Sequence, residues 1–239
     1  LNVPEDSLQG CRGRHLGGVV WAWVEASPPQ VPPAPFVGRE RETESVANRL
    51  RVTAMLGIVG PSGAGKSSFI QAGVLPALGS HWTSVIVRPG GSPLLALRTM
   101  VRGLEGLEDT TDEALAGTGL GNVLRAWGTA RKQSLMLYVD QFEELFTLCH
   151  DVAERKAYVD MLLHASLSPA DPLRVVFTVR DDFLLRCQQL EALRDRLVSG
   201  LQLLATPTPD DLLRILIEPA RRAGYEFDDP ALPAEMVQA

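Results

Sequence analysis

The sequence predicts an α/β fold with a five-stranded parallel sheet flanked by helices and followed by the start of a C-terminal helical lid. Five short, largely apolar runs alternate with segments of helical length. Such runs are typical of parallel strands that are buried on both faces, with helices as the connections between them. The expected strands are residues 54–59, 84–87, 135–140, 174–179 and 201–205.

Helices are expected before the first strand and in the segments between strands. The first helix, at about residues 40–50, is rich in charge and places Val46 and Leu50 four positions apart on one face. The others are expected at residues 66–78, 94–103, 113–131, 153–166 and 182–198. Such helices supply the crossover connections that parallel strands require.

Residues 208–239 are expected to begin a second, helical unit. Asp210 or Asp211 can cap a helix whose apolar residues recur at helical spacing, and Pro219 is expected to interrupt that helix. We therefore assign residues 36–207 to the sheet-containing domain and the remainder to the start of the lid.

Residues 1–35 stand apart from this pattern. Residues 26–35 contain five prolines, which remove backbone donors and favour an extended conformation, so this stretch is expected to be a linker. Residues 1–25 have no sustained helical or strand period, and we assign them no function.

The overall composition is that of a globular protein and narrows the class of ligand. The net charge of -6 and the pI of about 5.3 disfavour a protein that binds nucleic acid by neutralising its phosphates. The three cysteines form no CxxC pattern. The longest apolar run, residues 16–24, is about half as long as a membrane-spanning helix. We expect a cytoplasmic protein that binds nucleotide and contacts neither a membrane nor nucleic acid directly.

A glycine-rich motif supplies the strongest functional signal. Residues 60–67, Gly-Pro-Ser-Gly-Ala-Gly-Lys-Ser, match G-x-x-x-x-G-K-[ST] between an apolar strand and a helix-forming segment. Its glycines let the backbone curl so that N–H groups point at anionic oxygens. Lys66 would reach the β- and γ-phosphates, and the Ser67 hydroxyl would ligate Mg²⁺. The motif therefore predicts a P-loop for ATP or ADP with Mg²⁺. Its expected contact residues are Gly60, Ser62, Gly63, Ala64, Gly65, Lys66, Ser67 and Ser68.

An aspartate at the end of another expected strand is a candidate metal ligand. Residues 135–140 place Asp140 at the carboxyl edge of the sheet, where it can hold Mg²⁺. Many hydrolytic P-loop proteins have a glutamate directly after this aspartate, whereas Gln141 stands here, so hydrolysis is expected to be slow. Glu143 and Glu144 follow, and either could activate the attacking water. The alternative is that both only stabilise the first turn of the next helix.

Arg180 follows the apolar run 174–179 and is expected at the same edge of the sheet. It could sense the γ-phosphate and couple the nucleotide state to domain arrangement. Alternatively, it forms a salt bridge with Asp181 or Asp182. The candidate catalytic residues are thus Lys66, Asp140, Glu143, Glu144 and Arg180.

Together, these motifs resemble those of the STAND class of signal-transducing ATPases, specifically the novel STAND NTPase group. The resemblance extends from about Phe36 to the C-terminus and rests on several motifs in the same order. Besides the P-loop, the matching segments are residues 36–40, 66–78, 88–90, 140–147, 179–183, 217–220 and 223–224.

The resemblance implies a strand order of 5-1-4-3-2, with the Arg180 strand between the P-loop strand and the Asp140 strand. It also implies that Val37 and Gly38 line the adenine site and that Pro219 in the lid contacts the base. Members of this class switch between ADP-bound closed and ATP-bound open states. They carry effector and repeat regions, through which protein partners and nucleotide-dependent self-association are expected.

The leading hypothesis is an ATP-dependent signalling switch that hydrolyses its nucleotide slowly. One alternative is a turnover ATPase of motor or transport type, although no LSGGQ-like segment supports transport. The other is a domain that holds nucleotide as a structural element without hydrolysing it. The rate of hydrolysis would separate the three.

Overall fold

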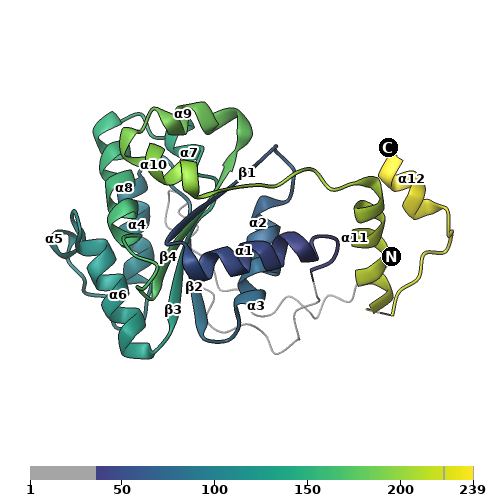
Figure 1. Cartoon of the computed structure of the whole chain (residues 1–239), viewed down its shortest axis with the longest axis horizontal. Coiled ribbons are helices and arrows are strands. Elements are labelled where there is room, and N and C mark those ends of the chain that lie inside the picture. Colours follow the sequence, from purple (N-terminus) through teal and green to yellow (C-terminus); the bar gives the residue numbers. More distant parts are fainter. Residues whose placement is uncertain (1–35, 223, 239) are drawn as a thin grey trace, which may run out of the picture.

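The sheet contains five parallel strands in the order β2-β3-β4-β1-β5 (Figure 1). This order is the expected 5-1-4-3-2 order, and β4 lies between β1 and β3. The computed structural model describes residues 36–222 and 224–238, so the expectations for residues 1–35 lie outside the described residues. The strands are β1 (Met55–Gly60), β2 (Trp82–Val87), β3 (Ser134–Val139), β4 (Leu173–Arg180) and β5 (Leu201–Leu203).

Helical segments connect these strands and form the lid. The expected helix at residues 66–78 is one helical run, in which α2 passes into a π-helical segment, η2, and then into α3. None of the helices in the described part of the chain is both long and apolar enough to cross a membrane. The helical segments are α1 (Glu40–Val52), α2 (Lys66–Ser68), η2 (Phe69–Val74), α3 (Leu75–Leu78), α4 (Pro93–Arg102), α5 (Asp112–Leu115), α6 (Gly119–Arg131), α7 (Glu144–Thr147), α8 (Val152–Ala165), η3 (Asp181–Phe183), α9 (Leu184–Gln188), α10 (Glu191–Ser199), α11 (Pro209–Arg222) and α12 (Leu232–Gln238).

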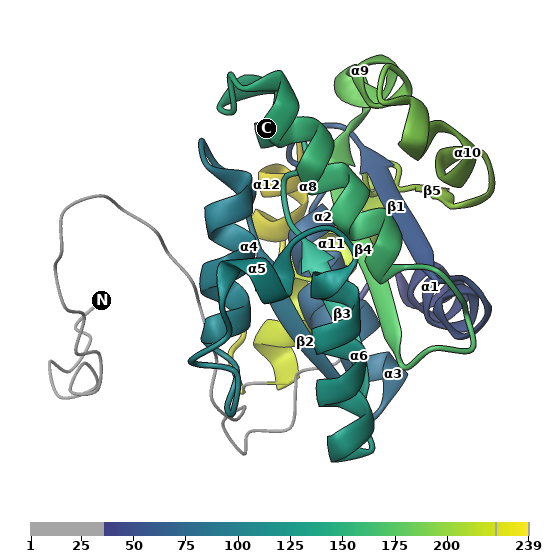
Figure 2. The same cartoon turned by 90° about the vertical axis from the view of Figure 1, so that its left-hand side faces the viewer.

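Helices cover both faces of the sheet, as Figures 1 and 2 show. On β1, Leu56 and Ile58 belong to the core beneath α1, η2 and α3. Met55 and Val59 belong to the core beneath α4, α6, α8 and α10. This alternation is the period of two that a strand imposes on its side chains. Because both faces of β1, β3 and β4 are buried, apolar residues are needed at nearly every position of these inner strands, which explains their continuous apolar runs.

Two of the expected helices are divided in the structure. Residues 113–131 lie in α5 and α6, which are separated because the backbone is extended at Ala116 and has a φ of +56° at Gly117. Residues 182–198 form η3, α9 and α10 in succession. These breaks change the connections but leave the order of the strands unaffected.

The lid helices α11 and α12 lie to one side of the sheet and are joined to it by an extended segment after β5 (Figure 1). The expected interruption at Pro219 is wrong, because α11 continues through it to Arg222. A proline removes one backbone hydrogen bond, and ion pairs from Arg214 and Arg222 to Glu218 span this part of the helix. None of the residues of α11 is buried.

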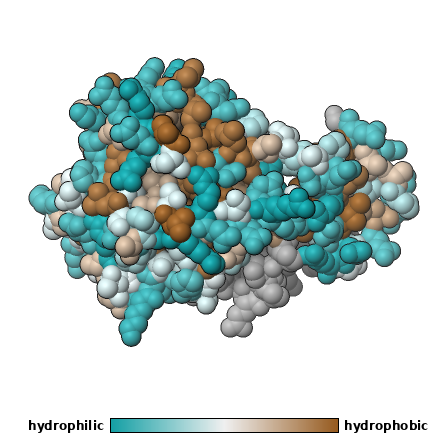
Figure 3. Space-filling model, viewed as in Figure 1, coloured by the Kyte–Doolittle hydropathy of each residue, from teal (hydrophilic) through white to brown (hydrophobic). Residues whose placement is uncertain are grey.

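Apolar side chains are exposed on both parts of the molecule. Figure 3 shows hydrophobic surface in the region of α9 and α10 and on the lid. Leu185 and Val198 are among the exposed residues of the first region, and Ile217 and Tyr225 are among those of the lid.

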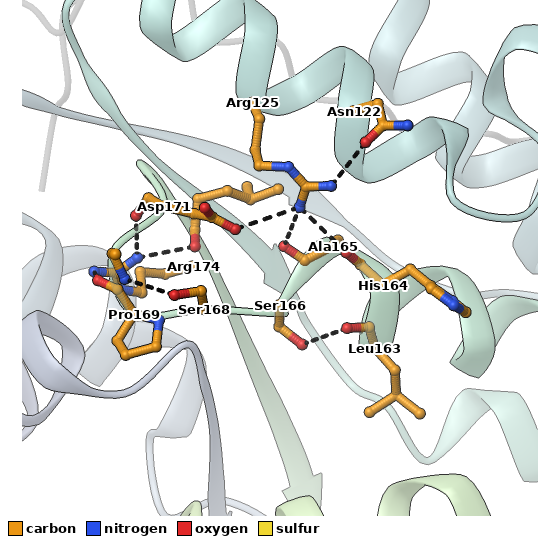
Figure 4. A network of polar contacts seen from close by, with 12 residues as sticks. Asn122, Arg125, Leu163, His164, Ala165, Ser166, Ser168, Pro169, Asp171 and Arg174 are labelled. Atoms are coloured by element: carbon orange, nitrogen blue, oxygen red, sulfur yellow. Dashed lines mark hydrogen bonds and ion pairs between the residues drawn. The ribbon is translucent and has the colours of Figure 1, made fainter.

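A polar network anchors the loop that enters β4, at the end of the sheet opposite to the carboxyl edge (Figure 4). Arg125 on α6 donates to the carbonyl of His164 (3.2 Å) and pairs with Asp171 (3.7 Å). Arg174 at the start of β4 donates to the carbonyl of Leu50 (2.7 Å) at the end of α1. These contacts fix β4 against helices on both faces and so hold its carboxyl end in position.

Candidate nucleotide-binding site

The P-loop, Asp140 and Arg180 meet at the carboxyl edge of the sheet. β1 ends at Gly60, which is the register partner of Arg180 at the end of β4. Asp140 follows β3 directly, and its backbone N–H donates to the carbonyl of Val87 at the end of β2 (2.9 Å). In open α/β sheets, ligands bind in the crevice outside the carboxyl ends of the strands. This edge is therefore the candidate site.

The loop between β1 and α2 has the backbone shape that its motif predicts. Gly63 and Gly65 have φ values of +78° and +77°, which residues with a side chain rarely adopt. A Cβ atom placed on either glycine would meet no atom within 4 Å, so the space beside the loop is open. Ala64 between them is buried, whereas Ser62 and Ser68 are exposed. The space beside these two glycines is therefore open to an anion.

Gly60 is required for a different reason. A Cβ atom at this position would collide with the carbonyl oxygen of Leu204, which directly follows β5. The N–H of Leu204 in turn donates to the carbonyl of Val59 (2.7 Å). The absence of a side chain at Gly60 thus permits the close pairing of β1 with β5.

Lys66 is folded back over its own loop. Its Nζ atom donates to the carbonyls of Gly60 and Pro61, each at 2.8 Å. Burial lowers the pKa of Lys66, and the nearby carboxylates of Glu143 and Asp181 oppose this effect. The ammonium therefore has two neutral acceptors. A phosphate oxygen, which is charged and accepts more strongly, could replace them.

Asp140 is fully buried and accepts hydrogen bonds from four side chains. Its Oδ1 atom accepts from Ser67 Oγ (2.7 Å), Tyr138 OH (2.7 Å) and Thr178 Oγ1 (2.9 Å). Its Oδ2 atom accepts from Nη2 (2.9 Å) and Nε (3.2 Å) of Arg88. Burial raises the pKa of Asp140, but the four donors outweigh this effect and hold the pKa below its ordinary value. Asp140 is therefore an ionised carboxylate at neutral pH.

Sequence reasoning did not identify Arg88, Tyr138 and Thr178 as parts of this site. Arg88 directly follows β2, so it reaches the same edge of the sheet. Tyr138 lies two positions before Asp140, and Thr178 lies two positions before Arg180, so each shares a strand face with a predicted site residue. These spacings were the available signal.

The arrangement fits a nucleotide bound with Mg²⁺. The hydroxyl of Ser67 and the carboxylate of Asp140 lie 2.7 Å apart and supply the kind of oxygen ligands that Mg²⁺ prefers. Lys66 adds a cation on the same loop, at the carbonyls of Gly60 and Pro61. The donor set is thus suited to polyphosphate and metal together.

Glu143 and Glu144 follow β3, and their side chains accept hydrogen bonds from different neighbouring segments. Gln141 has a φ of +57°, an unusual value for a residue with a side chain, so the chain turns sharply as it leaves the strand. The Oε2 atom of Glu143 accepts from the backbone N–H of Arg180 (3.3 Å), at the end of β4. The Oε2 atom of Glu144 accepts from the backbone N–H of Gly90 (3.0 Å), beyond β2. Burial raises the pKa of Glu144. The two carboxylates therefore lie on opposite sides of β3.

Arg180 is held by an ion pair at the surface. Its Nε and Nη2 atoms donate to the two carboxylate oxygens of Asp182 (3.0 and 2.7 Å), and its side chain is 42% exposed. The Cζ atom also lies 5.5 Å from the ring centroid of Phe183. Asp181 instead accepts from the backbone N–H of Asp182 (3.1 Å). Of the two salt bridges considered from the sequence, the structure contains the one with Asp182.

Val37 and Gly38 lie where the chain enters α1, beside the lid. Val37 is buried, and Gly38 has a φ of +90°. A Cβ atom at Gly38 would lie 3.0 Å from Cγ1 of Ile215, so α11 packs closely against this segment. Glu40 adds a bridge, because its Oε1 atom accepts from the N–H of Gly38 (3.2 Å) and from Arg214 (2.8 Å).

Pro219 lies one helical turn beyond Ile215 on α11 and is exposed. Residues four apart share a helix face, so Pro219 continues the face that reaches Gly38. The base-binding roles of Val37, Gly38 and Pro219 stay predictions.

The family of the chain follows from its match to a protein-family model. The model described as Novel STAND NTPase 1 matches residues 33–239, which is most of the chain. The chain belongs to the novel STAND NTPase family. This confirms the resemblance inferred from the motifs and makes the chain a nucleotide-binding NTPase domain with a P-loop fold. No curated protein matches this STAND NTPase significantly in sequence.

Solved structures with a similar fold have low sequence identity to this STAND NTPase. The Walker-type ATPase PABY2304 of Pyrococcus abyssi has a TM-score of 0.58 and 12% identity, with 88% of this chain and 66% of that chain covered. The ORC2 protein of Aeropyrum pernix, in ADPNP–ADP complexes, has a TM-score of 0.55 and 15% identity, with 81% and 55% covered. The HORMA:CdnC:Trip13 complex of E. coli MS115-1 has a TM-score of 0.51 and 13% identity, with 85% and 73% covered. The chain thus spans little more than half of the ORC2 chain, and the likeness concerns the fold alone.

Proposed function

We propose that this domain binds ATP and ADP with Mg²⁺ and acts as a slowly hydrolysing switch in a signalling protein. The observation that carries the proposal is the contact of Ser67 with Asp140 (2.7 Å) beside an open glycine loop. The family assignment supports nucleotide binding, and the ORC2 structure is one of ADPNP–ADP complexes. ATP and ADP are therefore the first ligands to test.

Each side chain at the edge of the sheet has a separate task in this proposal. Lys66 binds the β- and γ-phosphates in place of the carbonyls that it now contacts. Ser67 and Asp140 hold Mg²⁺, which neutralises negative charge on the terminal phosphates when it is bound. The loop N–H groups around Gly63 and Gly65 bind the phosphate oxygens.

Of the two candidate bases, the geometry favours Glu143. Its carboxylate accepts from the N–H of Arg180 and acts electrostatically on Lys66, so it lies on the phosphate side of β3. Glu144 instead accepts from Gly90, on the side of β2. In hydrolysis, Glu143 would take a proton from the attacking water as the water oxygen bonds to the γ-phosphorus and ADP departs.

The switch element in this proposal is Arg180. The γ-phosphate of ATP would replace Asp182 as the anionic partner of its guanidinium, whereas ADP would leave the ion pair in place. Gln141, in the position directly after Asp140, supports slow hydrolysis and therefore long-lived states. Protein partners and nucleotide-dependent self-association belong to the same proposal, and one structure with this fold is a complex of Trip13 with HORMA and CdnC.

Calorimetry in the presence of Mg²⁺ tests the proposal. Lys66→Ala should weaken binding of ADP and of a non-hydrolysable ATP analogue about 10- to 100-fold, the usual contribution of charged hydrogen bonds. Arg180→Ala should weaken binding of the ATP analogue and leave ADP binding unchanged. Lys156→Ala, a change at an exposed lysine of α8, is the control and should alter neither.

The proposal fails if the natural chain binds neither nucleotide. Hydrolysis measured on the same samples separates the other functions. Turnover faster than about 1 s⁻¹ would favour a working ATPase over a switch. Binding without any hydrolysis would favour a structural nucleotide.

A further inference from the structure

Asp140 divides its two oxygens between different kinds of partner. Oδ1 accepts from the hydroxyls of Ser67, Tyr138 and Thr178. Within the described chain, the hydrogen bonds to Oδ2 come from the guanidinium of Arg88 alone. The cation thus occupies the oxygen that the hydroxyls leave free.

The two members of this ion pair differ strongly in exposure. The side chain of Asp140 is 1% exposed, whereas that of Arg88 is 56% exposed. Asp140 is fixed by its hydroxyl donors and cannot move into water without losing them. Arg88 can exchange its carboxylate for water at a much lower cost, because its guanidinium already reaches solvent.

A second carboxylate lies within the electrostatic range of Arg88. Glu144 experiences the positive charge of this arginine and is held in place by the N–H of Gly90, two residues along from Arg88. If Arg88 leaves Asp140, it therefore still has a negative group beside it. Arg88 can therefore leave Asp140 without its positive charge becoming unpaired.

We propose that Arg88 competes with Mg²⁺ for Asp140 and thereby sets the metal concentration at which the domain takes up nucleotide. This inference rests on the proposed function, since it concerns the same site. A guanidinium on Oδ2 neutralises the carboxylate that the metal needs and repels a divalent cation nearby. Arg88 is thus a positioning residue, which holds Asp140 in the metal-free state and lowers its affinity for the metal.

The test is the Mg²⁺ dependence of ADP binding. ADP affinity is measured by calorimetry from metal-free buffer with chelator up to saturating MgCl₂, for the natural chain and for Arg88→Gln. The Mg²⁺ concentration that gives half of the affinity gain should fall about 3- to 10-fold in the variant, the scale of one neighbouring charge at a partly exposed site. Arg88→Lys keeps a cation but not the paired contact, so it should fall between the two.

Thermal unfolding without nucleotide supplies a second measurement, in which the variant should be impaired although its response to Mg²⁺ improves. Arg88→Gln should lower the Tm, because Asp140 loses its cationic partner, while Mg²⁺ acts at a lower concentration. A purely structural arginine would impair both stability and metal response. Arg102→Gln is the matched control, since Arg102 also pairs with an aspartate, Asp112 (2.6 Å), but on α4 away from the site.

The possible results separate this inference from the proposed function. If the natural chain binds ADP and the half-point in Arg88→Gln is unchanged or higher, the inference is overturned and the proposed function stands. If Arg88→Gln does not fold, Arg88→Lys decides the matter, and an unchanged half-point there overturns the inference. If the natural chain binds no ADP at any Mg²⁺ concentration, the proposed function fails and the inference with it.

Discussion

The ends of β3 and β4 carry opposite kinds of site although the two strands are neighbours. At the end of β3, Asp140 is fully buried and accepts from four side chains. At the end of β4, Arg180 is 42% exposed, and its paired carboxylate, Asp182, is 52% exposed. The first group is fixed before any ligand arrives, whereas the second is held by an interaction that a ligand can replace.

The energies of the two arrangements differ accordingly. An exposed ion pair contributes roughly 0–1 kcal/mol, because water competes for both charges. Removal of one member of a buried polar network costs several times more, because the remaining groups lose partners that water cannot replace. A metal-binding group such as Asp140 benefits from the rigidity of a buried network. A phosphate sensor such as Arg180 benefits from a partner that is easily exchanged.

The largest expected effect is the difference in the free energy of unfolding between Asp140→Ala and Arg180→Ala, which tests this contrast. Asp140→Ala should lower the free energy of unfolding by about 2–4 kcal/mol, because Tyr138 and Thr178 lose their buried acceptor. Arg180→Ala should change it by no more than about 1 kcal/mol. Urea unfolding without nucleotide measures both, and Asp140→Asn, which keeps an acceptor oxygen, should lose less than the alanine variant. Equal losses at the two positions would show that the contrast is wrong.

A smaller effect on stability than that of Asp140→Ala is expected from substitution of Glu144. Glu144 lies on the β2 side of β3, whereas Glu143 lies on the β4 side. The pKa of Glu144 is raised by burial, so the fold favours its neutral form and loses stability as pH rises through that pKa. Glu144→Gln removes this cost and should raise the Tm at pH 7 on the order of 1–2 °C. The gain should vanish below about pH 4.3, where the natural glutamate is protonated in the unfolded chain as well.

Glu143→Gln is the matched variant for this experiment. It should leave ADP binding intact and reduce hydrolysis, since Glu143 is the proposed base. Melting curves across pH 4 to 8 and turnover assays distinguish the two glutamates. A larger loss of hydrolysis in Glu144→Gln than in Glu143→Gln would reverse the assignment of their roles.

Local patterns predicted most of the fold. The apolar runs identified all five strands, most clearly β1, β3 and β4, whose burial on both faces leaves a continuous signature. The strand order came from the family resemblance and not from any single run. The path of α11 through Pro219 was not predicted, because it depends on how side chains such as Glu218 pair along the helix and not on the proline alone.

The candidate site was predictable only where it is local in sequence. The P-loop motif contains its own geometry, so the positive φ values of Gly63 and Gly65 follow from it. Arg88 lies 52 residues from Asp140, and their contact exists only because β2 and β3 pair in a particular register. Neither the charge of Arg88 nor its place after a strand identifies its partner without that register.

The smallest expected effect concerns the ion pair that holds Arg180. Asp182→Asn removes the charge of its partner, so the guanidinium should be freer to meet a γ-phosphate. Affinity for a non-hydrolysable ATP analogue should rise about 2- to 5-fold, the equivalent of one exposed ion pair, while ADP affinity stays unchanged. Calorimetry with both nucleotides measures the ratio, and Asp195→Asn, an exposed change on α10, controls for the loss of one negative charge. An equal gain in affinity for ADP would mean that Asp182 acts only through the net charge of the site. In that case Arg180 would not be a sensor of the γ-phosphate.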